Sequence, residues 1–209
     1  FFEGTWYLYY SGQNLFRKDA IGVATTRETD FPFGWKKYKN NPIFTKGKAA
    51  WESLDVVTLS LKRVGPKGKE WCGHYTARGE DRKYHLGICH GRSPYGPFMR
   101  NEKNPVLGPG RAWDSGGPAR ADFIEVNDKI HGAYESRGGF ATPFYVGEYS
   151  GDSLEGPFSN DPGNPTLSDW QYANPCLWQE NGKTYMLVGR KVKGDRTPYW
   201  RYVDLFVKQ

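Results

Sequence analysis

One phrase recurs three times along this chain, and it constrains the fold more than any other feature of the sequence. The phrase reads Asn41-Pro42-Ile43-Phe44, Asn104-Pro105-Val106-Leu107 and Asn164-Pro165-Thr166-Leu167, with spacings of 63 and 60 residues. A Trp and a polar residue follow each proline within five to nine residues, in Trp51-Glu52, Trp113-Asp114 and Trp170-Gln171. Self-similarity at a nearly fixed period indicates an architecture built from repeated units.

Between these phrases the sequence has the pattern of short strands. Pairs of apolar runs are separated by turns typical of hairpins, at Gly65-Pro66-Lys67-Gly68, Asn127-Asp128 and Asn181-Gly182. A further run and a Gly- or Pro-rich turn follow each pair, and the sustained 3.6-residue period of helices is missing. The pattern therefore predicts an all-β protein.

Three or four antiparallel strands per repeat favour a β-propeller, whose blades bury their faces by stacking around a central channel. A β-sandwich would explain the strand content but not the recurring phrase. We predict a single propeller domain over 1–209, with blade repeats at approximately 1–50, 51–112, 113–169 and 170–209. The first repeat lacks its Trp-acid strand and the fourth ends at its third strand. Either the two ends share one blade, or the chain is a piece of a longer protein or an unusually short one, which is the favoured interpretation.

The composition excludes several classes of protein. The chain has 8 Trp, 14 Tyr and 12 Phe, too much apolar area for a disordered chain, and no apolar stretch approaches the ~20 residues of a membrane span. We therefore predict a soluble protein without a membrane partner. The net charge is +6, but the Lys and Arg are scattered without a nucleic-acid motif, so nucleic acid is not a predicted partner. The sequence begins at Phe1-Phe2 without Met, so it leaves open whether the protein is secreted after removal of a signal peptide. The compartment is therefore unassigned.

The repeat resembles that of a known superfamily. The stretch NPVLGPGRAWDSGGPARADFIEVNDKIHGAYES and its partner YYSGQ…IGVATTRE…FGWKKYKNNPIF are similar to the blade repeat of the five-bladed propeller glycosidases. That superfamily comprises arabinanases, levansucrases and invertases and includes glycoside hydrolase family 43. SPYGPF and SLEGPF resemble the Ser-x-x-Gly-Pro-Phe turn of family 43 blades. The resemblance implies a central funnel for an oligo- or polysaccharide substrate, and hydrolysis of its glycosidic bonds by carboxylates.

Four carboxylates are the candidate catalytic residues: Asp55, Asp114, Glu52 and Glu135. A glycosidase needs one protonated and one ionised carboxyl, roughly 5 Å apart for retention or ~6.5–9.5 Å for inversion. Glu52 and Asp114 share one slot in successive repeats, which is more typical of a group that holds a turn, whereas Asp55 and Glu135 are singular. The enzyme hypothesis predicts two carboxyl groups that face each other across an axial pocket.

Some carboxylates that the resemblance implies are missing. The family 43 base belongs to a first inner strand that this chain does not contain, and its second Asp and its acidic Glu should fall near Gly117-Pro118 and Ala173-Asn174-Pro175. Neither position carries a carboxylate, and Glu155-Gly156-Pro157 lies in an outer turn. A non-catalytic carbohydrate-binding propeller, or a degenerate family member, is therefore the alternative to the hydrolase, and an interaction scaffold is a third hypothesis.

Five side chains are candidates for substrate binding: Arg120, Tyr172, Trp51, Trp113 and Trp170. Arg120 would bind a sugar hydroxyl or carboxylate bidentately, or pair with Asp122. Tyr172 is the preferred stacking residue, because recurrence favours packing between blades for the three Trp. The histidines have no joint metal spacing, and neither a metal nor a cofactor is predicted. The sequence leaves open whether the channel holds a structural Ca²⁺, since backbone carbonyls and water would bind it without a motif.

Overall fold

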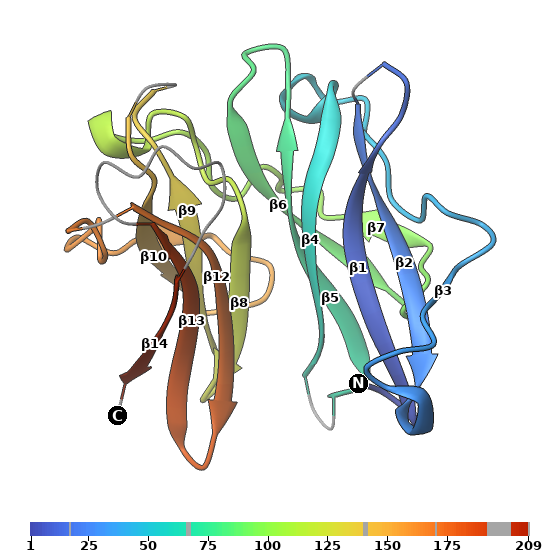
Figure 1. The fold of residues 1–209 in the computed structure, drawn as a ribbon. Coiled ribbons are helices and arrows are strands. Elements are labelled where there is room, and N and C mark those ends of the chain that lie inside the picture. Colours follow the sequence, from blue (N-terminus) through green and yellow to red (C-terminus); the bar gives the residue numbers. More distant parts are fainter. Residues whose placement is uncertain (17, 66–67, 140–141, 170, 192–201, 209) are drawn as a thin grey trace.

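Antiparallel strands form four sheets in the computed structural model, which describes all residues except 17, 66–67, 140–141, 170, 192–201 and 209 (Figure 1). The first sheet contains β1 (Thr5–Gln13), β2 (Asp19–Arg27) and β3 (Lys36–Lys37). The second contains β4 (Asp55–Val64), β5 (Glu70–Arg78), β6 (Tyr84–Gly91) and β7 (Phe98–Arg100). The third contains β8 (Ala121–Val126), β9 (Lys129–Ser136), β10 (Tyr145–Gly151) and β11 (Ser159–Asn160). The fourth contains β12 (Gln171–Glu180), β13 (Lys183–Lys191) and β14 (Tyr202–Lys208).

The prediction of an all-β fold is confirmed. Helical structure in the described residues is limited to short 3₁₀ turns, which include η1 (Glu28–Asp30), η2 (Ala50–Glu52) and η4 (Ala112–Asp114). The β8–β9 hairpin turns at Asn127 and Asp128 and the β12–β13 hairpin at Asn181 and Gly182, all four with positive φ. Such turns match the twist of the flanking strands, and Asn, Asp and Gly are the residues that tolerate them.

The Asn of each Asn-Pro phrase holds the third strand of its repeat. In all three copies the side-chain oxygen accepts the N–H of one strand residue, and the side-chain nitrogen donates to that same residue's carbonyl, at 2.8–2.9 Å. The pairs are Asn41 with Val23, Asn104 with Ile88 and Asn164 with Glu148. The recurring phrase is therefore a backbone clamp.

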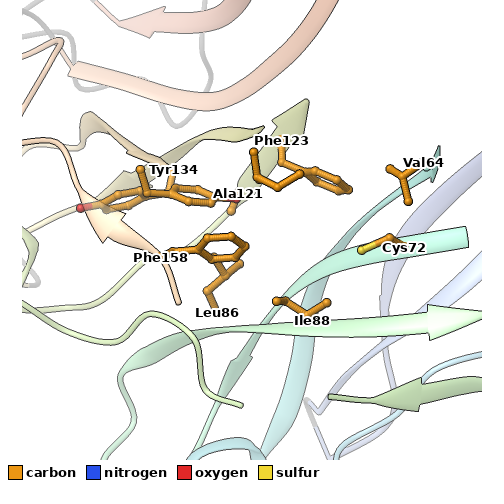
Figure 2. Packing of buried hydrophobic residues seen from close by; sticks show 10 residues of the cluster. Val64, Cys72, Leu86, Ile88, Ala121, Phe123, Tyr134 and Phe158 are labelled. Carbon is orange, nitrogen blue, oxygen red and sulfur yellow. The ribbon is translucent and has the colours of Figure 1, made fainter. Parts of the chain in front are cut away.

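Three buried clusters lie between consecutive sheets. One joins the first two sheets through Ile21, Phe44 and Val56, and another joins the last two through Ile124 and Leu177. Figure 2 shows the cluster between the second and third sheets, which includes Val64, Cys72, Leu86, Ile88, Ala121, Phe123, Tyr134 and Phe158. Each sheet thus buries apolar surface on its neighbour, as propeller blades do.

Two further observations concern the chain as a whole. All three cysteines are free, and Cys72 and Cys89 are buried thiols. No helix in the described part of the chain has the length and apolar character needed to cross a membrane.

Candidate functional site

The inner strands of all four sheets meet at a cavity of about 240 Å³, here called the axial cavity. Its lining includes Tyr10 and Ser11 of β1, Thr58 of β4, Arg120 just before β8, and Asn174 and Pro175 of β12. No Asp or Glu of the described chain belongs to that lining. The rest of the lining includes the apolar Ile21, Val57, Leu59 and Ala121, so the cavity combines apolar walls with polar groups, and its charged side chain is an arginine.

Two strands bulge where they border this cavity. The register of β4 against β5 shifts between Val56 and Thr58, and that of β12 against β13 shifts between Ala173 and Cys176. Asn174, within the second bulge, has a φ of 54°, which is uncommon for a residue with a side chain. Bulges unpair residues from the ladder and redirect their side chains, and they are frequent beside functional sites.

One buried carboxylate positions two residues of the cavity. Glu135 on β9 is 0% exposed, its Oε1 accepts a hydrogen bond from Arg120 Nη1, and its Oε2 accepts the Asn174 N–H at 2.7 Å. Burial raises the pKa of Glu135, although the charge of Arg120 opposes this effect. The Arg120 side chain is 48% exposed, so its guanidinium is anchored at one end and reaches solvent.

A second buried carboxylate joins three sheets around the axis. Asp122 on β8 accepts hydrogen bonds from the Ser60 hydroxyl and from Lys62 Nζ on β4, the latter at 3.1 Å. It also accepts the backbone N–H of Leu177 on β12 at 2.6 Å. Asp122 therefore stabilises the hub, and its oxygens are occupied by these donors.

Asp55 forms an ion pair with Arg78. It is 2% exposed and accepts two hydrogen bonds from Arg78, at 3.0 and 2.6 Å, and these bonds raise the pKa of the guanidinium. The same Nη2 atom lies 3.4 Å from Asp19 Oδ2, which sequence reasoning missed. Since both oxygens contact one nitrogen, they lie within about 6 Å of each other, near the ~5 Å of a retaining pair. The guanidinium of Arg78 thus lies between the two carboxyl groups and occupies both Asp55 oxygens.

Glu52 and Asp114 hold equivalent turns. Glu52 is 3% exposed and accepts hydrogen bonds from the Tyr75 hydroxyl at 3.1 Å and from Arg100 Nε at 2.7 Å. Asp114 is likewise buried and accepts the Tyr134 hydroxyl at 3.1 Å, while its Oδ1 has no hydrogen-bond partner in the described part of the chain. Each carboxylate thus ties a 3₁₀ turn to the second strand of its sheet.

The predicted stacking rings pack within the protein. The Trp51 ring lies 5.8 Å from that of Tyr75 and the Trp113 ring 5.7 Å from that of Tyr134, and neither Trp lines the axial cavity. Tyr172 is 3% exposed in the cluster between the last two sheets, so the faces of its ring are covered. Trp170 lies outside the described residues.

A second cavity, of about 550 Å³, also has Tyr10 in its lining. Its lining includes Asn14, Lys18, Asp19 and Lys46. In the described part of the chain, no three His, Cys, Asp or Glu side chains are grouped to hold a metal ion. The two cavities together offer amide, hydroxyl, ammonium and guanidinium groups, which are suited to binding a polar ligand.

The chain shares its fold with several glycoside hydrolases of known structure. The chain is similar to a family 117 glycoside hydrolase from the marine bacterium Zobellia galactanivorans, with a TM-score of 0.70 and 17% identity over 99% of this chain and 63% of that one. It is also similar to fructan 1-exohydrolase IIa from Cichorium intybus, with a TM-score of 0.72 and 10% identity over 98% of this chain and 40% of that one. A third similar structure, a family 32 β-fructofuranosidase from Bombyx mori, has a TM-score of 0.62 and 13% identity over 92% of this chain and 42% of that one.

These similarities are similarities of fold. The chain spans less than two thirds of the length of each of the three relatives. No protein-family model and no curated protein matches the sequence. These solved structures belong to different glycosidase families, so the likeness of fold does not select family 43.

Proposed function

We propose that this chain binds a saccharide in the axial cavity without cleaving it, as a degenerate relative of the propeller glycosidases. One observation carries the proposal. The buried carboxylate of Glu135 holds Arg120 and the Asn174 backbone in place at this cavity, and the described lining has no Asp or Glu. The site is therefore built for hydrogen bonding rather than for acid-base exchange.

The polar groups of the lining suit sugar recognition. Arginine presents several N–H donors in a fixed fork, while amide and hydroxyl groups both donate and accept. Arg120, Asn174, Thr58 and Ser11 supply these groups from all four sheets. The axial cavity of about 240 Å³ would hold a single sugar residue or part of one, and the second cavity, of about 550 Å³, falls within the ~300–1,000 Å³ of ligand pockets.

Hydrolysis is the second candidate function, and one observation favours it. The pKa of Glu135 is raised by burial, and a carboxyl kept protonated is what a general acid requires. Both Glu135 oxygens are engaged, however, by Arg120 and by Asn174. Cleavage through Glu135 would therefore require Arg120 to move away first.

A binding assay run beside a turnover assay distinguishes the two functions. Calorimetric titration with arabino-, xylo- and fructo-oligosaccharides is expected to show binding, and Arg120→Gln is expected to weaken it at least tenfold. Arg27→Gln is the matched control, because the Arg27 side chain is 78% exposed and pairs only with its near neighbour Asp30 among the described contacts.

Aryl glycosides and the same oligosaccharides serve for turnover. The binding function predicts no product release. Turnover that disappears in Glu135→Gln or Asp55→Asn would establish hydrolysis instead. Absence of binding to the entire panel, with Arg120→Gln indistinguishable from the parent, would refute a saccharide site.

A further inference from the structure

We infer that the saccharide of the axial cavity carries an acidic group, a carboxylate or a sulfate ester, and that Arg120 binds this group. The inference rests on the proposed function, because it names the class of saccharide that the same cavity takes. Carboxylate and sulfate share the relevant chemistry, which is a compact anion with at least two oxygens able to accept parallel N–H bonds.

The first argument is the geometry of Arg120. A guanidinium has five N–H donors on three nitrogens, and the described hydrogen bonds of Arg120 use only Nη1, which donates to Glu135. Nearly half of the side chain is exposed, and the residue lines the axial cavity. The donors on Nε and Nη2 thus remain for a ligand, and they form the edge that pairs bidentately with a carboxylate or sulfate.

The second argument is the role of Glu135. Its carboxylate fixes the guanidinium from the buried side, at 0% exposure, while its other oxygen accepts the Asn174 N–H at 2.7 Å. An arginine held in advance loses less conformational freedom when it binds an anion. Glu135 partly neutralises Arg120, but because it is enclosed, its oxygens do not compete for the ligand in the cavity.

The third argument is the absence of repulsion. An anionic ligand is disfavoured where it meets like charges across an interface, and this can cost several kcal/mol. No carboxylate of the described chain lines the axial cavity, and Asp122 nearby is occupied by Lys62, Ser60 and Leu177. A neutral sugar would not pair with the positive charge of Arg120.

The fourth argument is the charge of the surroundings. Two lysines, Lys18 and Lys46, line the second cavity, and its one carboxylate, Asp19, lies 3.4 Å from Arg78. The chain as a whole has a net charge of +6, which favours the approach of anions.

Matched ligands test the inference by calorimetric titration. Trigalacturonic acid is compared with its full methyl ester, which keeps the sugar backbone and removes the charge, and galactose 6-sulfate is compared with galactose. We expect at least one acidic member to bind tenfold or more tightly than its neutral match. The preference should shrink as salt is raised from 20 to 500 mM, because salt screens charge. Which acidic ligand shows the preference identifies the carboxylate or the sulfate as the group bound.

Variants assign the preference to Arg120. Arg120→Gln should abolish it, Arg120→Lys should keep a reduced preference because a point charge replaces the fork, and Arg27→Gln should leave it unchanged. Arg120→Gln leaves Glu135 buried without its cation, so the double variant Arg120→Gln/Glu135→Gln provides a folded alternative without either charge. That double variant should bind acidic and neutral members equally.

The outcomes separate the inference from the proposed function. Equal binding of acidic and neutral members by the parent protein would overturn the inference and leave saccharide binding intact. A preference that survives in the double variant would also overturn it, since another cation would then be responsible. Binding of no member by the parent would overturn both.

Discussion

Replacing Asp122 with alanine removes the acceptor that joins three sheets around the axis. The carboxylate accepts hydrogen bonds from Ser60 and Lys62 of the second sheet and from the Leu177 N–H of the fourth. Asp122 itself belongs to the third sheet and its side chain is 10% exposed. In the alanine variant these three donors lose their shared partner at one time.

The magnitude follows from what each donor loses. A buried donor left without an acceptor costs about 1–3 kcal/mol; the Leu177 N–H is such a group, and the half-buried Ser60 hydroxyl loses part of that amount. The Lys62 side chain is 28% exposed, so water replaces part of what it loses, and its Nζ keeps the Leu177 carbonyl at 2.9 Å. We expect a loss of about 3–4 kcal/mol in the free energy of unfolding, a large share of the ~5–15 kcal/mol typical of a domain.

Urea unfolding followed by tryptophan fluorescence measures this loss. With a slope of about 2 kcal/mol per M, the midpoint should fall by about 1.5–2 M. Asp152→Ala is the matched control, because its carboxylate is 92% exposed and lies 3.4 Å from Lys129. Exposed pairs contribute about 0–1 kcal/mol, so the control should stay close to the parent. An Asp122→Ala midpoint equal to that of the control would refute the view that this carboxylate holds the hub together.

Three further predictions concern other sites. His74 is fully buried, and desolvation lowers its pKa from 6.5 to about 3. The folded state therefore disfavours the protonated imidazole, and the contribution of neutral His74 to the free energy of unfolding is fully present above pH 6.5. Stability should therefore fall by up to ~1.4 kcal/mol per pH unit between pH 6.5 and 3, and His74→Leu should remove this contribution from urea midpoints measured across that range. Gly87→Ala should lower stability by about 1–3 kcal/mol in the same assay, because its Cβ would lie 2.6 Å from the Tyr75 ring, whereas Gly139→Ala, with nothing within 4 Å, should change little. Glu135→Gln keeps an acceptor for the Asn174 N–H, so calorimetry should still detect the saccharide; complete loss of binding would show that the negative charge itself is required.

The sequence was sufficient to predict the all-β fold because its local signals are periodic. Strand runs, Asn-Gly and Asn-Asp turns and the Asn-Pro phrase each recur, and turn chemistry depends on a few adjacent residues. The function of the phrase was not predictable, since the clamp of Asn104 on Ile88 depends on contacts between segments 16 residues apart. Recurrence therefore indicated that the phrase matters without showing how.

The candidate site shows where sequence reasoning stops. Sequence reasoning selected Glu135 because the equivalent positions of the other repeats are not acidic. It did not predict that Arg120 is the ion-pair partner of Glu135, because that pairing depends on the strand register. The Glu135 N–H donates a hydrogen bond to the Arg120 carbonyl of the neighbouring segment, which brings the two side chains together, whereas Asp122 of β8 contacts Lys62 of another sheet. Tyr172 was predicted to face the channel, but the bulge after Ala173 interrupts the two-residue alternation, and Tyr172 and Ala173 are both buried. Register and bulges arise from long-range pairing, which one sequence does not show.

The chemistry that the buried carboxylates can support depends on the cations with which they pair. Asp55 pairs with Arg78, Glu52 with Arg100, Glu135 with Arg120, and Asp122 with Lys62. In each pair the cation occupies carboxylate oxygens that a glycosidic bond would have to reach before acid-base catalysis could occur. One of these cations, Arg120, lies at the axial cavity, whose described lining contains no carboxylate. The cavity therefore presents a fixed guanidinium to a ligand and no accessible carboxyl group, which supports the proposal that it binds an acidic saccharide rather than cleaves it.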